Sequence, residues 1–226
     1  IAWAAGEDAA VALRFLVYLD LLLLAGLPLC ARRTVPGEIP ARLIAGLAIA
    51  GALLAIAQLL ITALAMTGGD VAILDAEMLR FIAIETPAGL SGVVRFGLLV
   101  LLAVAAARAR RVSTLHTLLA LAALAALAWT GHAGASEGGL GLLHRGFDIL
   151  HLIAASAWLG TLLLLLCALI HSGIGTADLI AALHRFAFTG TLIVGVLIVS
   201  GIVNLWAIAG IEALPGLAAT DYGRTL

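Results

Sequence analysis

Hydrophobic residues run along this chain in long continuous stretches, separated by short segments that collect charges, glycines and prolines. A helix needs roughly 20 apolar residues to cross about 30 Å of hydrocarbon. Transmembrane β-strands are shorter and alternate between polar and apolar residues, which is not the pattern here. We therefore predict an all-α, polytopic transmembrane helix bundle. The six predicted spans are Val11–Cys30, Leu43–Met66, Val93–Ala107, Leu115–Trp129, Phe147–Ile170 and Phe186–Ile208.

Arginines and acids gather in alternate connections between these spans. The arginines of the first, third and fifth connections are Arg32, Arg33, Arg42, Arg108, Arg110, Arg111 and Arg185. The acids of the N-terminal segment and of the second and fourth connections are Glu7, Asp8, Asp70, Asp75, Glu77, Glu85 and Glu137. Because cytoplasmic connections are enriched in arginine, this alternation predicts that the N-terminus lies outside.

The chain is predicted to form one transmembrane domain, residues 1–226. Its longest connection, Thr67–Gly92, contains a stretch of mixed polarity, Val71–Ile84, that is typical of a short interfacial helix. The segment Ala219–Leu226 has the pattern of an approach to another span. We therefore expect at least one further helix beyond the last residue.

Composition excludes several classes of function. Hydrophobic residues make up 64% of the chain and charged residues 11%, and the mean hydropathy is +1.21, which excludes a soluble domain and makes the lipid bilayer the main partner. A net charge of −1 provides no basic excess for binding nucleic acid. No nucleophile elbow, phosphate-binding glycine loop or HExxH motif is present, so we do not expect an enzyme.

Polar residues collect at the outer ends of the predicted spans, where ionisable groups in lipid are costly and are functional candidates by default. On the fifth span, His144, Asp148, His151 and Trp158 fall within an arc of roughly 80° at about 100° per residue. Ser200 and Asn204 lie one turn apart on the sixth span, with Asn204 at about the depth of His151. His132 follows the fourth span, and Gln58 and Met66 lie in the outer half of the second.

Imidazole, carboxylate and thioether groups at one depth are suited to a transition metal. Histidine and aspartate favour Cu(II) or Zn(II), whereas methionine favours Cu(I). The candidate ligands are His132, His151, His144, Asp148 and Met66, with Trp158, Ser200, Asn204 and Gln58 as supporting residues. Simpler interpretations remain open: His132 and His144 as interfacial residues, Asp148 as a partner of Arg145 or a helix cap, and the tryptophans as membrane-belt anchors.

Several segments resemble the copper resistance protein D (CopD) family of bacterial inner-membrane proteins, most strongly from residue 129 to residue 226. The segments are TGHAG (Thr130–Gly134), DILHLIAASAWLG (Asp148–Gly160), ETPAGLSGVVRF (Glu85–Phe96), HRFAFTGTLIVGVLIVSGIVN (His184–Asn204) and DYGRTL (Asp221–Leu226). The resemblance implies copper handling at the cytoplasmic membrane, usually import, alongside a periplasmic copper-binding protein. It matches His132 and His151 to the family's histidines, and Trp158, Ser200 and Gly201 to their surroundings.

The leading hypothesis is therefore copper-ion transport across the cytoplasmic membrane through an outer histidine-containing site. One alternative is a membrane electron carrier that holds b-type haem between paired histidines, with His116 and His132 about 24 Å apart on one span. In that case His151 could face His132, but His171 or His184 would have to reach His116. Another alternative is a protein that delivers copper to a respiratory enzyme during its assembly.

Overall fold

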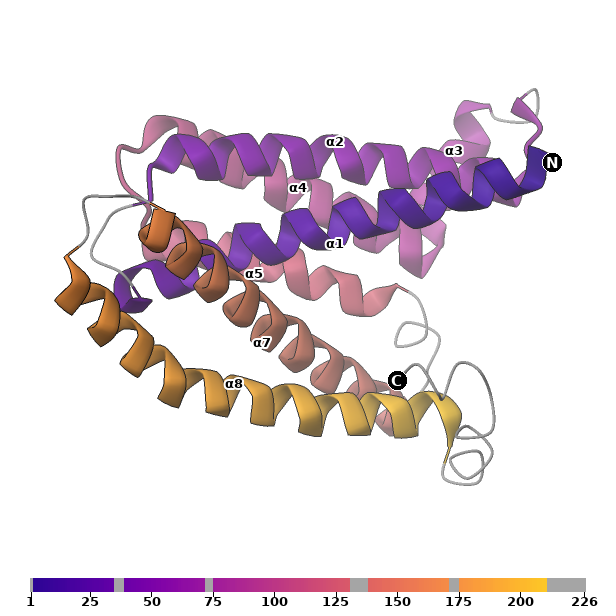
Figure 1. The fold of residues 1–226 in the computed structure, drawn as a ribbon. Coiled ribbons are helices and arrows are strands. Elements are labelled where there is room, and N and C mark those ends of the chain that lie inside the picture. Colours follow the sequence, from indigo (N-terminus) through magenta and orange to yellow (C-terminus); the bar gives the residue numbers. More distant parts are fainter. Residues whose placement is uncertain (1, 35–38, 72–74, 131–137, 171–174, 211–226) are drawn as a thin grey trace.

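The computed structural model describes residues 2–34, 39–71, 75–130, 138–170 and 175–210 of the chain (Figure 1). It confirms an all-α bundle. The helices are α1 (Ala2–Thr34), α2 (Ala41–Met66), α3 (Ala76–Glu85), α4 (Pro87–Arg108), α5 (Thr114–Ala125), the 3₁₀ turn η2 (Ala126–Trp129), α7 (Gly138–Ile170) and α8 (Thr176–Ala209).

Five of the six predicted spans correspond to helices that are long and apolar enough to cross a membrane: α1, α2, α4, α7 and α8. The fourth predicted span is shorter and consists of α5 followed by η2. Because a 3₁₀ turn rises about 2.0 Å per residue, these two pieces together reach roughly 26 Å, close to the thickness of the hydrocarbon.

The long helices run between two ends of the bundle. An isolated β-bridge between Pro40 and Arg111 joins the start of α2 to the connection between α4 and α5 at one end. We call the opposite end, where α1 and α7 begin, the outer end, following the predicted orientation. Helix α3 lies at this outer end and packs against α4 (Figure 1). Asp75 caps α3 by accepting a 2.8 Å hydrogen bond from the amide of Met78, so the helix predicted in this connection is confirmed from Ala76 onward.

All six predicted spans begin earlier in the structure than the sequence pattern predicts, and in α4 and α7 the difference changes where polar residues lie. Helix α4 begins at Pro87, with the Thr86 hydroxyl accepting a 3.0 Å hydrogen bond from the amide of Gly89. Proline at the first position and threonine at the cap are favourable because the first helical amides have no partner within the helix. As a result, Arg95 lies about two turns inside α4. Helix α7 begins at Gly138, so His144 is part of the helix.

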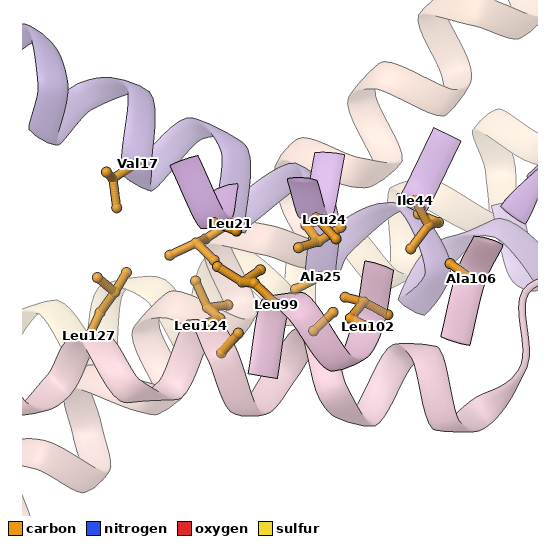
Figure 2. Packing of buried hydrophobic residues seen from close by; sticks show 14 of the residues in the cluster. Val17, Leu21, Leu24, Ala25, Ile44, Leu99, Leu102, Ala106, Leu124 and Leu127 are labelled. Atoms are coloured by element: carbon orange, nitrogen blue, oxygen red, sulfur yellow. The ribbon is translucent and has the colours of Figure 1, made fainter. Parts of the chain in front are cut away.

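The apolar core lies between α1, α2, α4 and α5. Figure 2 shows Leu21 and Leu24 of α1 beside Leu99 and Leu102 of α4, together with Leu124 of α5, and all five are at most 1% exposed. One ionisable side chain, Asp20, is buried at the edge of this cluster, and its Oδ2 has no hydrogen-bond partner among the described residues. Gly51 of α2 makes room for it, since a Cβ there would overlap this oxygen.

Helix α7 joins the core to α8. Its inner half crosses α1 where the backbones of Gly26 and Gly160 touch, because a Cβ at either glycine would overlap the other helix. Small residues at such a crossing allow close backbone packing between membrane helices. On its other side α7 packs against α8, with the rings of Trp158 and Phe186 5.2 Å apart between centroids.

Candidate metal site

The strongest polar contact between α7 and α8 joins His151 to Ser200. The Nδ1 atom of His151 lies 2.9 Å from the Oγ of Ser200, and Ser200 is completely buried. Gly201 lies beside the imidazole, because a Cβ there would stand 3.7 Å from His151 Cε1. The structure therefore brings together three residues that the sequence placed near one another on two different spans.

The serine hydroxyl determines which imidazole nitrogen carries the proton. Ser200 Oγ lies 2.6 Å from the carbonyl oxygen of Val196 and 3.3 Å from that of Leu197, and donates its only proton toward this pair. Because a hydroxyl has one proton and two lone pairs, and this proton is directed at the carbonyls, we assign Ser200 as the acceptor of a hydrogen bond from His151 Nδ1–H. Nε2 of the neutral ring then keeps its lone pair, which is the form that binds a metal.

His144 and Asp148 continue the same face of α7 toward its outer end. His144 is buried, at 3% exposed, and Asp148 is half-buried. The carboxylate of Asp148 lies within electrostatic range of both His144 and His151. The predicted stripe on α7 thus faces the protein interior at His144, and its carboxylate lies within electrostatic range of two imidazoles.

Asn204 lies one turn outward from Ser200 on α8. Its side-chain oxygen, Oδ1, is buried and has no hydrogen-bond partner among the described residues. A buried acceptor without a partner is costly, by roughly 1–3 kcal/mol, and is satisfied by a water, an ion or a ligand. This oxygen is therefore a further candidate donor atom at the outer end of the α7–α8 interface.

Among the other predicted site residues, His132 falls outside the described residues, so its place in the site stays a prediction. Met66 is 58% exposed at the end of α2, a helix that packs mainly against α4 and α1. Trp158 lies about two turns inward of His151, against Phe186 of α8. Gln58 binds Arg95, through a 2.6 Å hydrogen bond from Nη2 to Oε1.

Within the part of the chain that the structure describes, no three His, Cys, Asp or Glu side chains are close enough to hold one metal ion together. His151 and Asp148 thus offer an incomplete ligand set that needs a further donor. The sequence prediction assigns that role to His132.

A second polar group, which the sequence analysis did not single out, is centred on Arg95. This side chain is 2% exposed and lines a cavity of about 270 Å³ together with Arg14, Tyr18 and Gln58. Tyr18 lies within electrostatic range of Arg95 and of Asp148, so it stands between the two polar groups. The Thr86-Pro87 pair was the available signal, because it starts α4 early enough to place Arg95 inside the membrane.

Of the haem pairings considered, only that of His116 with His184 falls within the described residues, because His132 and His171 lie outside them. Nδ1 of His116 is 2.7 Å from the Ser113 hydroxyl at the start of α5, and His184 is exposed on α8. Helix α8 packs mainly against α7, and α5 packs mainly against α4 and α1. Two axial histidines must face each other across one haem, which this arrangement of His116 and His184 does not provide.

Comparison with known proteins identifies the family. Residues 5–142 match the family model described as "Copper resistance protein D-like, N-terminal domain". Copper resistance protein D of Pseudomonas syringae pv. tomato is 33% identical over 97% of this chain and 76% of its own length. The chain belongs to the copper resistance protein D family. Inner membrane protein YebZ of Escherichia coli K12 is 35% identical over 43% of this chain and 33% of its own length.

Family membership agrees with the resemblance found in the sequence, although the family model matches the N-terminal part of the chain and the resemblance was strongest from residue 129 onward. The Pseudomonas relative covers both regions. Together with the five long apolar helices, these relatives make this CopD-family chain a multi-pass inner-membrane protein. No solved structure matches it significantly.

Proposed function

We propose that this CopD-family protein moves copper ions from the periplasm across the inner membrane, using a site between the outer halves of α7 and α8. The observation that carries the proposal is the His151–Ser200 contact, which directs the proton to Nδ1 and leaves Nε2 able to bind a metal. Family membership supplies the choice of copper, since the Pseudomonas relative is a copper resistance protein.

The ligand set that we propose combines nitrogen and oxygen donors. His151 Nε2 binds the ion, Asp148 supplies negative charge beside it, and His144 and His132 act as further imidazole ligands on the outer side. Such donors favour Cu(II), whereas Cu(I) is bound more strongly by thioethers such as that of Met66. The Cu(II) form of the hypothesis is therefore supported by the packing of α2, which bears Met66, mainly against α4 and α1.

Transport requires that the ion leave the site as well as enter it. A set of two or three ligands that are not locked into a closed cage allows exchange, which is what conduction needs. Tyr18, within electrostatic range of Asp148, is the described polar group next to the site on α1. We propose that a periplasmic copper-binding protein delivers the ion to the outer end of α7.

The direct test is copper uptake by cells that express the His151→Ala variant. We expect accumulation to fall to the level of cells without the protein, because the variant removes the candidate ligand that contacts Ser200 across the α7–α8 interface. His184→Ala is the matched control, since His184 is an exposed histidine on α8. Equal accumulation by both variants at equal membrane levels would contradict the assigned site.

Reconstituted vesicles distinguish transport from delivery. If the purified chain moves copper into sealed vesicles in a His151-dependent manner, it transports the ion. If it binds copper at His151 but moves none, the site belongs to a delivery protein for a respiratory enzyme, which was the alternative function.

A further inference from the structure

A cavity of about 270 Å³ lies at the outer end of the bundle, away from α8. Its lining residues come from α1, α2, α4 and the end of η2, and α7 and α8 contribute none of them. The polar side chains with nitrogen or phenol groups on its wall are Arg14, Tyr18, Gln58 and Arg95. The cavity is thus formed by other helices than the proposed metal site, although Tyr18 on its wall lies within electrostatic range of Asp148.

The guanidinium of Arg95 is buried and incompletely paired. Its Nη2 donates to Gln58 Oε1, whereas Nε and Nη1 have no hydrogen-bond partner among the described residues. Among the described residues, the ionisable group that interacts electrostatically with Arg95 is the phenol of Tyr18, and no carboxylate does so. Burying a cation without a counterion is costly by several kcal/mol, so arginines inside membranes normally pair or face a polar ligand.

The composition of the cavity wall is that of an anion site. Two arginines line it, and no aspartate or glutamate does so within the described chain. Because Gln58 Oε1 accepts from Arg95, the other end of the same amide, Nε2, can only donate. Arginine forks bind phosphate and carboxylate oxygens in pairs. The two guanidinium groups, the Gln58 amide and the Tyr18 phenol together offer more hydrogen-bond donors than the two oxygens of a carboxylate need. A phosphate group, which has more oxygens, uses more of these donors.

From this arrangement we infer that the cavity binds a phosphate-type oxyanion, with Arg95 at its base and Arg14 at its exposed side. The volume of about 270 Å³ is enough for such a group with several waters, since each water occupies roughly 30 Å³. The same chemistry is found in free phosphate and in the headgroup of an anionic lipid. The inference does not depend on copper and would stand if the proposed transport function failed.

Thermal unfolding of the full chain in a neutral detergent tests the inference, because a ligand that binds the folded state raises the melting temperature. One arm compares sodium phosphate with sodium chloride at equal ionic strength, and the other compares phosphatidylglycerol with phosphatidylethanolamine. Copper is absent from both arms. A rise with phosphate identifies a free oxyanion as ligand, a rise with phosphatidylglycerol alone identifies a lipid headgroup, and either result supports the site.

Two pairs of variants locate the binding. Arg14→Gln removes the exposed arginine of the cavity, and Arg80→Gln removes an exposed arginine of α3 as its control. Gly92→Leu adds a side chain at the cavity wall, where a Cβ meets nothing within 4 Å, and leaves both arginines in the chain. Gly97→Leu is its control, because Gly97 is equally open but does not line the cavity.

We expect Arg14→Gln and Gly92→Leu to weaken binding by about tenfold or more, as the loss of a charged hydrogen bond predicts, and the two controls to bind like the wild type. Arg95→Gln should abolish binding if it folds, but the test does not rely on it. The inference is overturned if neither probe stabilises the wild-type chain above its comparison, or if Arg14→Gln and Gly92→Leu respond like their controls.

Discussion

Helix α7 makes two contacts of opposite character, one in each half. In its inner half it meets α1 at Gly26 and Gly160, where backbone packs directly on backbone. In its outer half it meets α8 through the side chains of His151 and Ser200. The inner contact depends mainly on shape, because nothing larger than hydrogen fits between the helices at these glycines, and Cys30 Sγ also donates to Ala157 O at 3.4 Å. The outer contact depends on polar atoms that can exchange partners with an ion.

Two buried serines make the difference explicit. Ser156 and Ser200 are both completely buried, and both donate to a carbonyl of their own helix, at 2.8 Å from Ile153 O and 2.6 Å from Val196 O. Only Ser200 is also bonded to an imidazole. The same residue type therefore serves packing at one contact and positions a candidate ligand at the other. Substitutions in the inner half should change stability, and those in the outer half should change copper binding.

The largest effect is expected at the inner contact. Gly26→Val places a side chain where the backbone of Ser156 already lies, so α1 and α7 must separate. We expect a loss of about 3 kcal/mol in unfolding free energy, at the upper end for overpacked sites, or failure to accumulate in the membrane. Thermal unfolding in detergent measures it. Gly46→Val is the control, because a Cβ at Gly46 meets nothing within 4 Å, and it should unfold near the wild-type temperature.

At the outer contact, Ser200→Ala removes the hydroxyl that contacts His151 Nδ1 and that we propose orients the ring for metal binding. Loss of such a supporting hydrogen bond weakens metal binding by roughly 10–100-fold in other sites, and we expect a change in this range. Copper titration of the purified protein measures it. Ser156→Ala removes a hydroxyl of equal burial, and the comparison of the two contacts fails if both variants weaken copper binding equally.

Asp148→Asn is expected to have a smaller effect on the same measurement. The amide keeps the size of the carboxylate but removes the negative charge between His144 and His151. We expect several-fold weaker copper binding with unchanged thermal stability. A variant that binds copper normally but unfolds at a lower temperature would instead show that Asp148 stabilises α7, for example by pairing with Arg145.

The smallest effect is expected for Trp158→Phe. Trp158 contacts Phe186 about two turns inward of the site, so a smaller aromatic ring should preserve most of the packing. We expect the free energy of unfolding to fall by less than about 1.5 kcal/mol, the usual limit for substitutions between apolar side chains of similar volume. Copper affinity should not change. A clear loss of copper binding in this variant would extend the site inward beyond His151.

Much of the fold could be predicted from the chain because continuous apolar runs determine where membrane helices form. The polar face of α7 also followed from helical spacing, which brings His144, Asp148 and His151 onto one side regardless of the neighbours. The pairing of His151 with Ser200 required more, because it depends on how α7 and α8 rotate against each other. Sequence spacing gives similar depth on two helices but not mutual orientation.

The misplaced elements have local causes. The prediction started the third span at Val93, after the charge-bearing and turn-like residues, whereas the Thr86 cap starts the helix at Pro87. Arg95 was predicted near the edge of this span, whereas the structure places it about two turns inside α4, where it contacts Gln58. Met66 ends α2, a helix that packs mainly against α4 and α1, so its role as a ligand stays a prediction.

Electron paramagnetic resonance of Cu(II) bound to the purified chain tests the central claim most directly, because nitrogen ligands split the copper signal. We predict nitrogen coupling in the wild-type protein and in the His184→Ala control, with a coupled nitrogen lost in His151→Ala. An identical spectrum and identical copper affinity in wild type and His151→Ala would show that the ion binds elsewhere and would contradict the assignment of the site to the α7–α8 interface.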